Sequence, residues 1–321
     1  MTYWTSYFTE VIAPLQTKAN LQAMAMPEQT PFEQLVFSGG GTRCFWHGGF
    51  LDTVRGPLGL KPERVAGVSG GALAAACFIG GRDEKLLEVM GAAFDRRDVN
   101  VSTNWNEIGE NGLTPHQQMY REVVADTLDA EAIGRIADGP AFEVLLAHPP
   151  HSGFPKLSTF PMMAAYLADI AIRSTPHVIF PETLGARQQL VDARKAARDG
   201  LIVDLICNAA VIPPVFNLQG WNGRKVIDGG MTSKAPMPTG NRGRTLVLLT
   251  RKFRNLPDHP DRVYVEPSRA VPADKIDFTD RGKIVATWNA GMADGRSFLR
   301  AFASTAPLVA ANSSPSPADP A

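Results

Sequence analysis

Short, almost continuous apolar runs alternate along this chain with longer stretches in which apolar residues recur every three or four positions. The short runs predict buried strands at 34–37, 65–68, 215–218, 224–227, 245–249 and 262–266. The longer stretches predict helices, notably at 45–54, 70–80, 84–94, 115–128 and 186–198. Such alternation is typical of an α/β fold, here a three-layer α/β/α sandwich with a mainly parallel central sheet.

The same pattern divides the chain into segments. An amphipathic stretch at 1–30 precedes one large domain at 31–303, whose region 99–200 reads as a variable cap or loop region, and a small-residue, Pro-rich tail at 304–321 is expected to be disordered. The apolar stripe of the first stretch fits packing against the domain or an interfacial anchor. Asn222-Gly223 between apolar runs predicts a hairpin turn.

Composition and charge narrow the classes of partner. The 321 residues carry 32 Lys and Arg and 32 Asp and Glu, so the net charge is zero. This balance argues against a nucleic-acid partner and against strong electrostatic attraction to an anionic membrane. The three cysteines, Cys44, Cys77 and Cys207, have neither zinc-ligand spacing nor a count that fits paired disulfides. The sequence shows neither a signal peptide nor a segment apolar enough to span a membrane. We therefore expect a cytoplasmic protein, with peripheral contact with a membrane surface as an open alternative.

The segment Gly67-Val68-Ser69-Gly70-Gly71 follows an apolar run and opens an alanine-rich helix, which is the context of a nucleophile elbow. Glycines on both sides of Ser69 allow a sharp turn that projects the hydroxyl clear of the backbone. Free N–H groups at the start of the helix, with Gly70 first, lie beside it and suit an oxyanion. A helix N-cap in a tight turn is the structural alternative for Ser69.

A second source of donors is the strand that runs into Gly39-Gly40-Gly41-Thr42-Arg43. Consecutive glycines let the main chain aim several N–H groups at one ligand. Arg43 fits either of two roles, pinning this loop or meeting a phosphate or carboxylate of a substrate.

The base for Ser69 is expected to be Asp228, which follows a strand-like run and precedes two glycines. A turn-forming aspartate is the structural alternative. Among the six histidines only His47 stands inside a glycine-marked motif, and we interpret it as a packing or loop-supporting residue.

These three segments, in this order, resemble the patatin-like phospholipases, whose members share a Gly-rich oxyanion segment, a G-x-S-x-G elbow and a D-G-G/A segment with the catalytic aspartate. The sequence departs from that pattern at Cys44, where the family usually has glycine, and in the segment before Asp228. The resemblance implies a lipid acyl hydrolase with a Ser69–Asp228 dyad, with oxyanion donors at Gly39, Gly40, Gly41 and Gly70, and with no metal and no cofactor. It also implies calcium-independent activity on phospholipids or simpler acyl esters.

Three alternatives stay open at this point. An acyltransferase uses the same dyad with an alcohol in place of water, and an inactive lipid-binding protein retains only the elbow. A nucleotide-binding module is the third, although the glycines fit neither the P-loop nor the dinucleotide pattern. The apolar stretch 161–172 is expected either to pack in the core or to form a wall for acyl chains.

Overall fold

The structure is a computed structural model that describes residues 31–96, 113–149, 164, 174–177, 185–213, 216–240 and 242–311, with side chains described up to residue 304. The predicted N-terminal amphipathic segment and, apart from residue 164, the apolar stretch 161–172 lie outside these residues.

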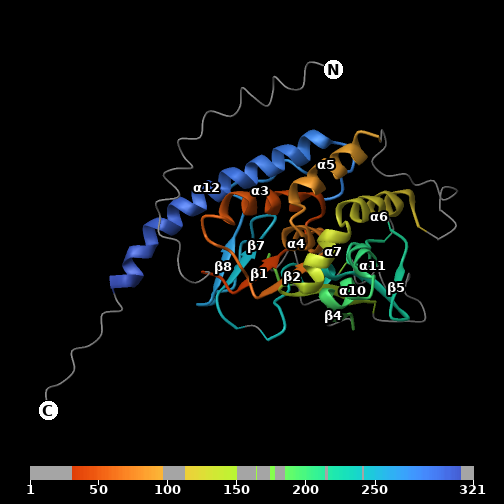
Figure 1. The fold of residues 1–321 in the computed structure, drawn as a ribbon, viewed down its shortest axis with the longest axis horizontal. Coiled ribbons are helices and arrows are strands. Elements are labelled where there is room, and N and C mark those ends of the chain that lie inside the picture. The colour runs from red at the N-terminus through yellow and green to blue at the C-terminus, as the bar shows by residue number, and fades with distance from the viewer. Residues whose placement is uncertain are drawn as a thin grey trace, which may run out of the picture.

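An eight-stranded mixed sheet forms the centre of the molecule (Figure 1). Its strands are β1 (Gln34–Phe37), β2 (Arg64–Val68), β3 (Ala141–His148), β4 (Arg187–Asp192), β5 (Gln219–Trp221), β6 (Arg224–Asp228), β7 (Thr245–Leu248) and β8 (Arg262–Val265). They are ordered β5-β6-β3-β2-β1-β7-β8, with β4 also paired to β3. The pairs among β3, β2, β1, β7 and β8 are parallel, whereas β4, β5 and β6 pair antiparallel. The predicted α/β class with a mostly parallel sheet is therefore confirmed.

Helices follow most of these strands. They are α3 (Phe45–Val54), α4 (Gly70–Gly80), α5 (Asp83–Phe94), α6 (Pro115–Thr127), α7 (Ala130–Asp138), α10 (Ala193–Arg198), α11 (Ile202–Asn208) and α12 (Arg281–Ala311), with short 3-10 turns η1 (Gly41–Cys44) and η3 (Gly229–Met231). Figure 1 shows the long α12 lying along α3 above the β1, β7 and β8 end of the sheet.

The two faces of the sheet are covered differently. Alternate residues of β1 divide between two buried clusters, because successive side chains of a strand point to opposite faces. Leu35 and Phe37 belong to the large cluster of buried side chains, to which the described helices also contribute. Val36 belongs to a smaller cluster with Ala235 and Met237. The predicted three-layer sandwich requires helices over this second face as well, and that layer stays a prediction.

Several predicted elements match the observed ones. Helices α3 and α4 have the predicted bounds, and the predicted hairpin is formed by β5 and β6 around Asn222 and Gly223, with φ of 49° and 75°. Positive φ at both central residues is what a type I′ turn requires.

Three sequence interpretations are wrong. The helix predicted at 186–198 is β4 followed by α10, because Arg187–Asp192 pairs with β3. Strand β3 itself was not predicted, and the strand expected at 215–218 begins later, at Gln219. Helix α12 continues through residues 304–311, where a disordered tail was expected. The rest of the expected tail, residues 312–321, lies outside the described residues.

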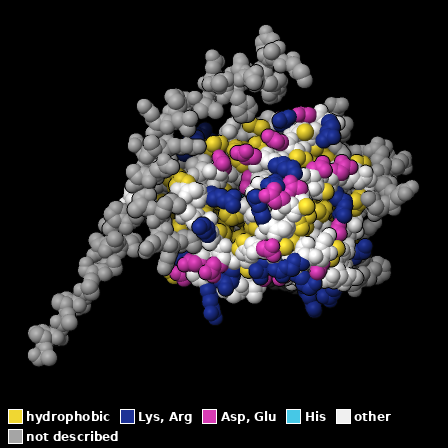
Figure 2. All heavy atoms as spheres, in the orientation of Figure 1, with side chains coloured by type: hydrophobic (Ala, Val, Ile, Leu, Met, Phe, Trp, Pro, Cys, Tyr) yellow, Lys and Arg dark blue, Asp and Glu magenta, His cyan; other side chains and the backbone are white. Residues whose placement is uncertain are grey.

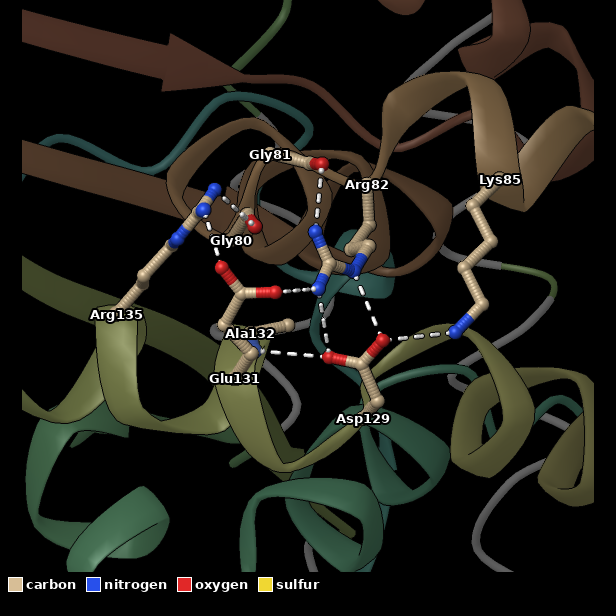
Figure 3. A network of polar contacts seen from close by, with 8 residues as sticks. All are labelled: Gly80, Gly81, Arg82, Lys85, Asp129, Glu131, Ala132 and Arg135. Atoms are coloured by element: carbon tan, nitrogen blue, oxygen red, sulfur yellow. Dashed lines mark hydrogen bonds and ion pairs between the residues drawn. The ribbon is translucent and has the colours of Figure 1, made fainter.

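A network of charged side chains joins the end of α4 and the start of α5 to α7 (Figure 3). Arg82 donates to both oxygens of Asp129 at 3.0 and 2.9 Å, and Lys85 donates to Asp129 at 2.9 Å. Glu131 contacts Arg82 and Arg135. We call these five residues the α4–α7 ion network. It fastens α7 to α5 and to the end of α4 on the surface.

The visible surface carries Lys and Arg side chains intermixed with Asp and Glu (Figure 2), in keeping with the zero net charge. Within the described ranges, none of the helices combines the length and the apolar character needed to cross a membrane.

Candidate active site

Ser69 stands between the end of β2 and the first residue of α4, with φ of 55° and ψ of −136°. A residue other than glycine seldom adopts a positive φ, because its Cβ then crowds the backbone. The turn closes so tightly that a Cβ on Gly67 would lie 2.8 Å from the Cα of Ala72, and one on Gly71 would lie 2.3 Å from the carbonyl oxygen of Ser38. The predicted strand, turn and helix around Ser69 are therefore present.

Asp228 is the last residue of β6, and strand register explains why it meets Ser69. Val68 of β2 is level with Leu145 of β3, and the next residue of β3, Leu146, is level with Asp228. Ser69, one residue beyond Val68, thus reaches the same level as Asp228. Residues far apart in the sequence are brought together by pairing with the same central strand.

The two side chains form a short hydrogen bond. The Ser69 hydroxyl Oγ donates to Oδ2 of Asp228 at 2.7 Å, and the two residues are only 3% and 2% exposed. The other carboxylate oxygen, Oδ1, accepts from the N–H of Gly230 at 2.7 Å. One oxygen is thereby fixed by the backbone while the other faces the hydroxyl, which is the orientation needed to accept its proton.

The glycine segment after β1 packs directly against the elbow. A Cβ on Gly39 would lie 3.3 Å from the Cβ of Ser69, and one on Gly70 would lie 2.6 Å from the carbonyl oxygen of Gly41. Thr250 holds this segment from the other side, because its hydroxyl donates to the Gly39 carbonyl at 3.0 Å.

The N–H groups of the glycine segment do not all face the same way. Gly39 donates to the carbonyl of Lys234 at 2.9 Å, so its predicted role as an oxyanion donor is corrected. Gly40 is the N-cap residue of η1, Gly41 is its first residue, and Gly70 is the first residue of α4. The first N–H groups of a helix have no acceptor within it. These three glycines therefore remain candidates for donors beside Ser69.

Lys234 is a buried cation that sequence analysis missed. It is 8% exposed, and both its Nζ and a carboxylate oxygen of Asp228 lie within 3.5 Å of the point that a Cβ on Gly230 would occupy. Burial lowers the pKa of Lys234 to about 8, against the attraction of Asp228 that raises it. The only sequence signal was a lysine within a run that is otherwise free of charge, from Gly229 to Gly240.

Arg43 adds a second positive charge near the same place. It is half-buried on η1, and its charge opposes protonation of Lys234, which lowers the pKa of that lysine further. Cys44, the departure from the family pattern, is 5% exposed and its thiol lies 3.5 Å from the Ser38 carbonyl. Burial raises the pKa of Cys44 well above its usual value, so the thiol stays protonated.

His47 belongs to the core. It is fully buried, and its ring lies edge-on to Phe37 and Trp46, with centroids 5.6 and 6.0 Å away. Burial lowers the pKa of His47 to about 3, so the ring is neutral at neutral pH. The hydroxyl of Ser69 is bonded to Asp228 instead, which agrees with the interpretation of His47 as a packing residue.

A cavity of about 710 Å³, including its open mouth, begins at Ser69. Its walls come from α4, α5, α6 and the segments around residues 212 and 276. The lining side chains are mostly apolar and include Leu73, Leu86, Met90, Ile212, Ile276 and Phe278. An apolar cavity beside a polar nucleophile suits a ligand with a hydrocarbon chain next to a polar reacting group.

Metal ligands do not gather in the part of the chain that the structure describes. No group of three or more His, Cys, Asp or Glu side chains there is placed to hold an ion. Among the described residues, the charged groups around the site include the carboxylate of Asp228 and the cations of Arg43, Lys234, Arg251 and Lys275.

Comparison with known proteins gives a family and likenesses among solved structures. Among curated proteins, no sequence match was found. The crystal structure of VipD from Legionella pneumophila resembles this structure with a TM-score of 0.48 and 10% sequence identity, over 86% of this chain and 69% of that chain. The sequence model described as patatin-like phospholipase matches residues 35–239, which include the glycine segment, the elbow and Asp228. The chain belongs to the patatin-like phospholipase family, whose members are typically hydrolases of carboxylic esters.

Proposed function

We propose that this protein is a serine acyl hydrolase that cleaves lipid ester bonds through a dyad of Ser69 and Asp228. The observation that carries the proposal is the buried 2.7 Å hydrogen bond between the two side chains, at the edge of an apolar cavity. Membership in the patatin-like phospholipase family supports a lipid substrate.

The first half of the reaction forms an acyl-enzyme. The Ser69 oxygen attacks the acyl carbonyl as its proton passes to Oδ2 of Asp228, and the carbonyl oxygen becomes an oxyanion. The N–H groups of Gly40, Gly41 and Gly70 donate to that oxyanion. The tetrahedral intermediate then collapses, and the leaving alcohol takes the proton from Asp228.

The second half releases the acyl group. Water attacks the acyl-enzyme and gives its proton to Asp228, a second tetrahedral intermediate forms at the same donors, and Ser69 regains its proton as the fatty acid leaves. Each half of the reaction returns Asp228 to its ionised form, so one carboxylate serves both halves of the cycle.

An aspartate with an ordinary pKa of about 4 is a weak base, and the geometry eases its task. The hydrogen bond is already formed, so proton transfer needs no rearrangement of either side chain. The cations of Lys234 and Arg43 stabilise the negative charge of the site as it moves from the carboxylate toward the oxyanion.

The acyl chain is proposed to occupy the apolar cavity. Its walls bury methylene groups, and each buried methylene contributes about 0.8 kcal/mol to binding. Phospholipids and simpler acyl esters share this acyl part and differ only in the leaving alcohol. The proposal covers both.

The test is a panel of phospholipids, lysophospholipids, acylglycerols and short aryl esters, assayed with the wild type and with Ser69→Ala. We expect hydrolysis of several lipid esters by the wild type and none above background by Ser69→Ala. Equal activity of both proteins contradicts the nucleophile, and a flat response across all esters contradicts the lipid assignment. Turnover is expected to persist in EDTA, and calcium-dependent recovery after EDTA contradicts the metal-free mechanism.

A further inference from the structure

A second cavity, of about 810 Å³ including its mouth, lies beside the apolar one. It is bounded by α6, α11 and the β5–β6 turn. Two of its lining residues, Tyr120 and Phe216, also line the cavity that begins at Ser69. Among the described residues, these two rings are the side chains common to both cavities.

Tyr120 and Phe216 form a wall by packing on each other. Tyr120 projects from α6, and Phe216 comes from the segment between α11 and β5. Their ring centroids are 6.3 Å apart with an interplanar angle of 44°, within the range of roughly 4.5–7 Å that is usual for packed aromatic pairs. Both residues are buried, at 7% and 6% exposure.

The two cavities differ in chemistry. The second is lined by polar side chains, among them Gln117, Asn208 and the ion pair of Arg121 with Asp204, whose atoms lie 2.5 Å apart. The buried indole N–H of Trp221 has no hydrogen-bond acceptor within the described part of the chain. A hydrocarbon chain that enters this space covers the partly exposed ion pair and takes it out of water without pairing with it, which is unfavourable.

We propose that the Tyr120–Phe216 wall limits the acyl chains that Ser69 accepts, by closing the apolar cavity against the polar one. This inference rests on the proposed acyl hydrolase function. Chains that fit on the Ser69 side of the wall gain from each added methylene, by about fourfold in kcat/KM. Longer chains meet the two rings and gain nothing further.

The experiment measures kcat/KM for a series of p-nitrophenyl esters from acetate to palmitate, all of which share one leaving group. The kcat/KM of the wild type is expected to rise with chain length and to stop rising at a definite length. Tyr120→Ala and Phe216→Ala each free the space of one aromatic ring, which takes about two further methylenes before the chain reaches the polar lining. Each variant is expected to shift that limit to longer chains, with the ratio of long-chain to short-chain kcat/KM raised about tenfold or more.

Tyr120→Phe is the matched control, because it keeps the ring and removes only the hydroxyl. Its chain-length limit is expected to equal that of the wild type. Active sites are counted by fluorophosphonate titration of Ser69, so partly unfolded protein does not distort the comparison. Since the readout is a ratio within each variant, general damage to the fold leaves it unchanged.

The outcomes separate this inference from the proposed function. An unchanged limit in both alanine variants overturns the wall, even when every variant hydrolyses esters. A shift in Tyr120→Phe as large as that in Tyr120→Ala also overturns it, because the ring is then not what limits the chain. Absence of ester hydrolysis by the wild type refutes the function itself.

Discussion

Two regions of this molecule place an aspartate beside basic side chains, and they use it in opposite ways. In the α4–α7 ion network, Asp129 accepts hydrogen bonds from Arg82, Lys85 and the N–H of Ala132, and its side chain is 38% exposed. In the candidate site, Asp228 is 2% exposed and keeps one oxygen for the Ser69 hydroxyl. Hydrogen-bond donors surround the carboxylate of Asp129, whereas one oxygen of Asp228 contacts the hydroxyl that is to be deprotonated.

The backbone around the two carboxylates differs as well. Asp129 caps the N-terminus of α7 in an extended conformation that costs nothing. Asp228 faces a serine with positive φ, held in place by glycines whose Cβ atoms would collide with the backbone. Strain of this kind persists only when the surrounding structure enforces it. The same residue type therefore fastens helices where it is exposed and can perform chemistry where it is buried.

The largest expected effect comes from removing the base. Asp228→Asn keeps the acceptor for the Gly230 N–H but takes no proton from Ser69, so kcat is expected to fall by about 10²- to 10⁴-fold. Asp129→Asn is the matched change in the other region and is expected to leave kcat within about twofold. Steady-state assays with circular dichroism of both variants make this measurement. Comparable losses in the two variants would erase the distinction between the regions.

The next effect concerns glycines. A Cβ on Gly40 would lie 2.4 Å from the hydroxyl of Thr250, so Gly40→Ala must displace the proposed oxyanion donors. We expect kcat to fall by about 10²- to 10³-fold, and Thr250→Gly in the same chain to restore part of it.

Gly134 of α7 is the control for Gly40, because nothing lies within 4 Å of an added Cβ. Gly134→Ala is expected to raise the free energy of unfolding by about 0.5–1 kcal/mol, since alanine favours helix, with kcat unchanged. Full activity of Gly40→Ala would contradict the role of this glycine segment as an oxyanion donor.

A third effect is the pH dependence that Lys234 brings. Its pKa is about 8 in the folded protein and 10.5 in the unfolded chain, so between these values the unfolded chain binds more protons. The free energy of unfolding of the wild type therefore rises relative to that of Lys234→Met from pH 8 to 10.5, by on the order of 3 kcal/mol. Urea unfolding of both proteins across this range gives the difference. A difference that is constant with pH refutes a buried, destabilised ammonium.

The smallest effect is the loss of the surface network. Asp129→Ala removes the cap of α7 and the partner of Arg82, and is expected to lower Tm by a few degrees without affecting hydrolysis. Its hydrogen bonds lower the pKa of Asp129 in the folded state. The stabilisation that Asp129 gives to the folded protein is therefore present above its unfolded pKa of 3.8 and is lost as the pH falls below that value. Thermal unfolding at pH 7 and pH 3 tests this, and a gap in Tm that widens at pH 3 contradicts it.

Sequence patterns located the local parts of the site well. Val65 to Gly71 reads as strand, turn and helix from its own residues, and Asp228 is marked by the glycines that follow it. The partnership of Asp228 with Ser69 depends on register across β3, a strand that the pattern missed.

The remaining errors share one cause. Residues 187–192 have a composition that favours helix, but pairing with β3 makes them a strand, because tertiary contacts override local propensity. Likewise, nothing in the sequence shows that Lys234 is buried beside a carboxylate, or that the N–H of Gly39 donates to the carbonyl of that lysine.

Covalent labelling with a fluorophosphonate tests the central claim most directly, because it reports the nucleophile without requiring the natural substrate. The wild type should be phosphonylated at Ser69, as located by peptide mass spectrometry, and Ser69→Ala should not react. Asp228→Asn should react at least about 100-fold more slowly, because its side chain cannot take the serine proton. Labelling of Asp228→Asn at the wild-type rate, or labelling of the wild type at another residue, would contradict the dyad.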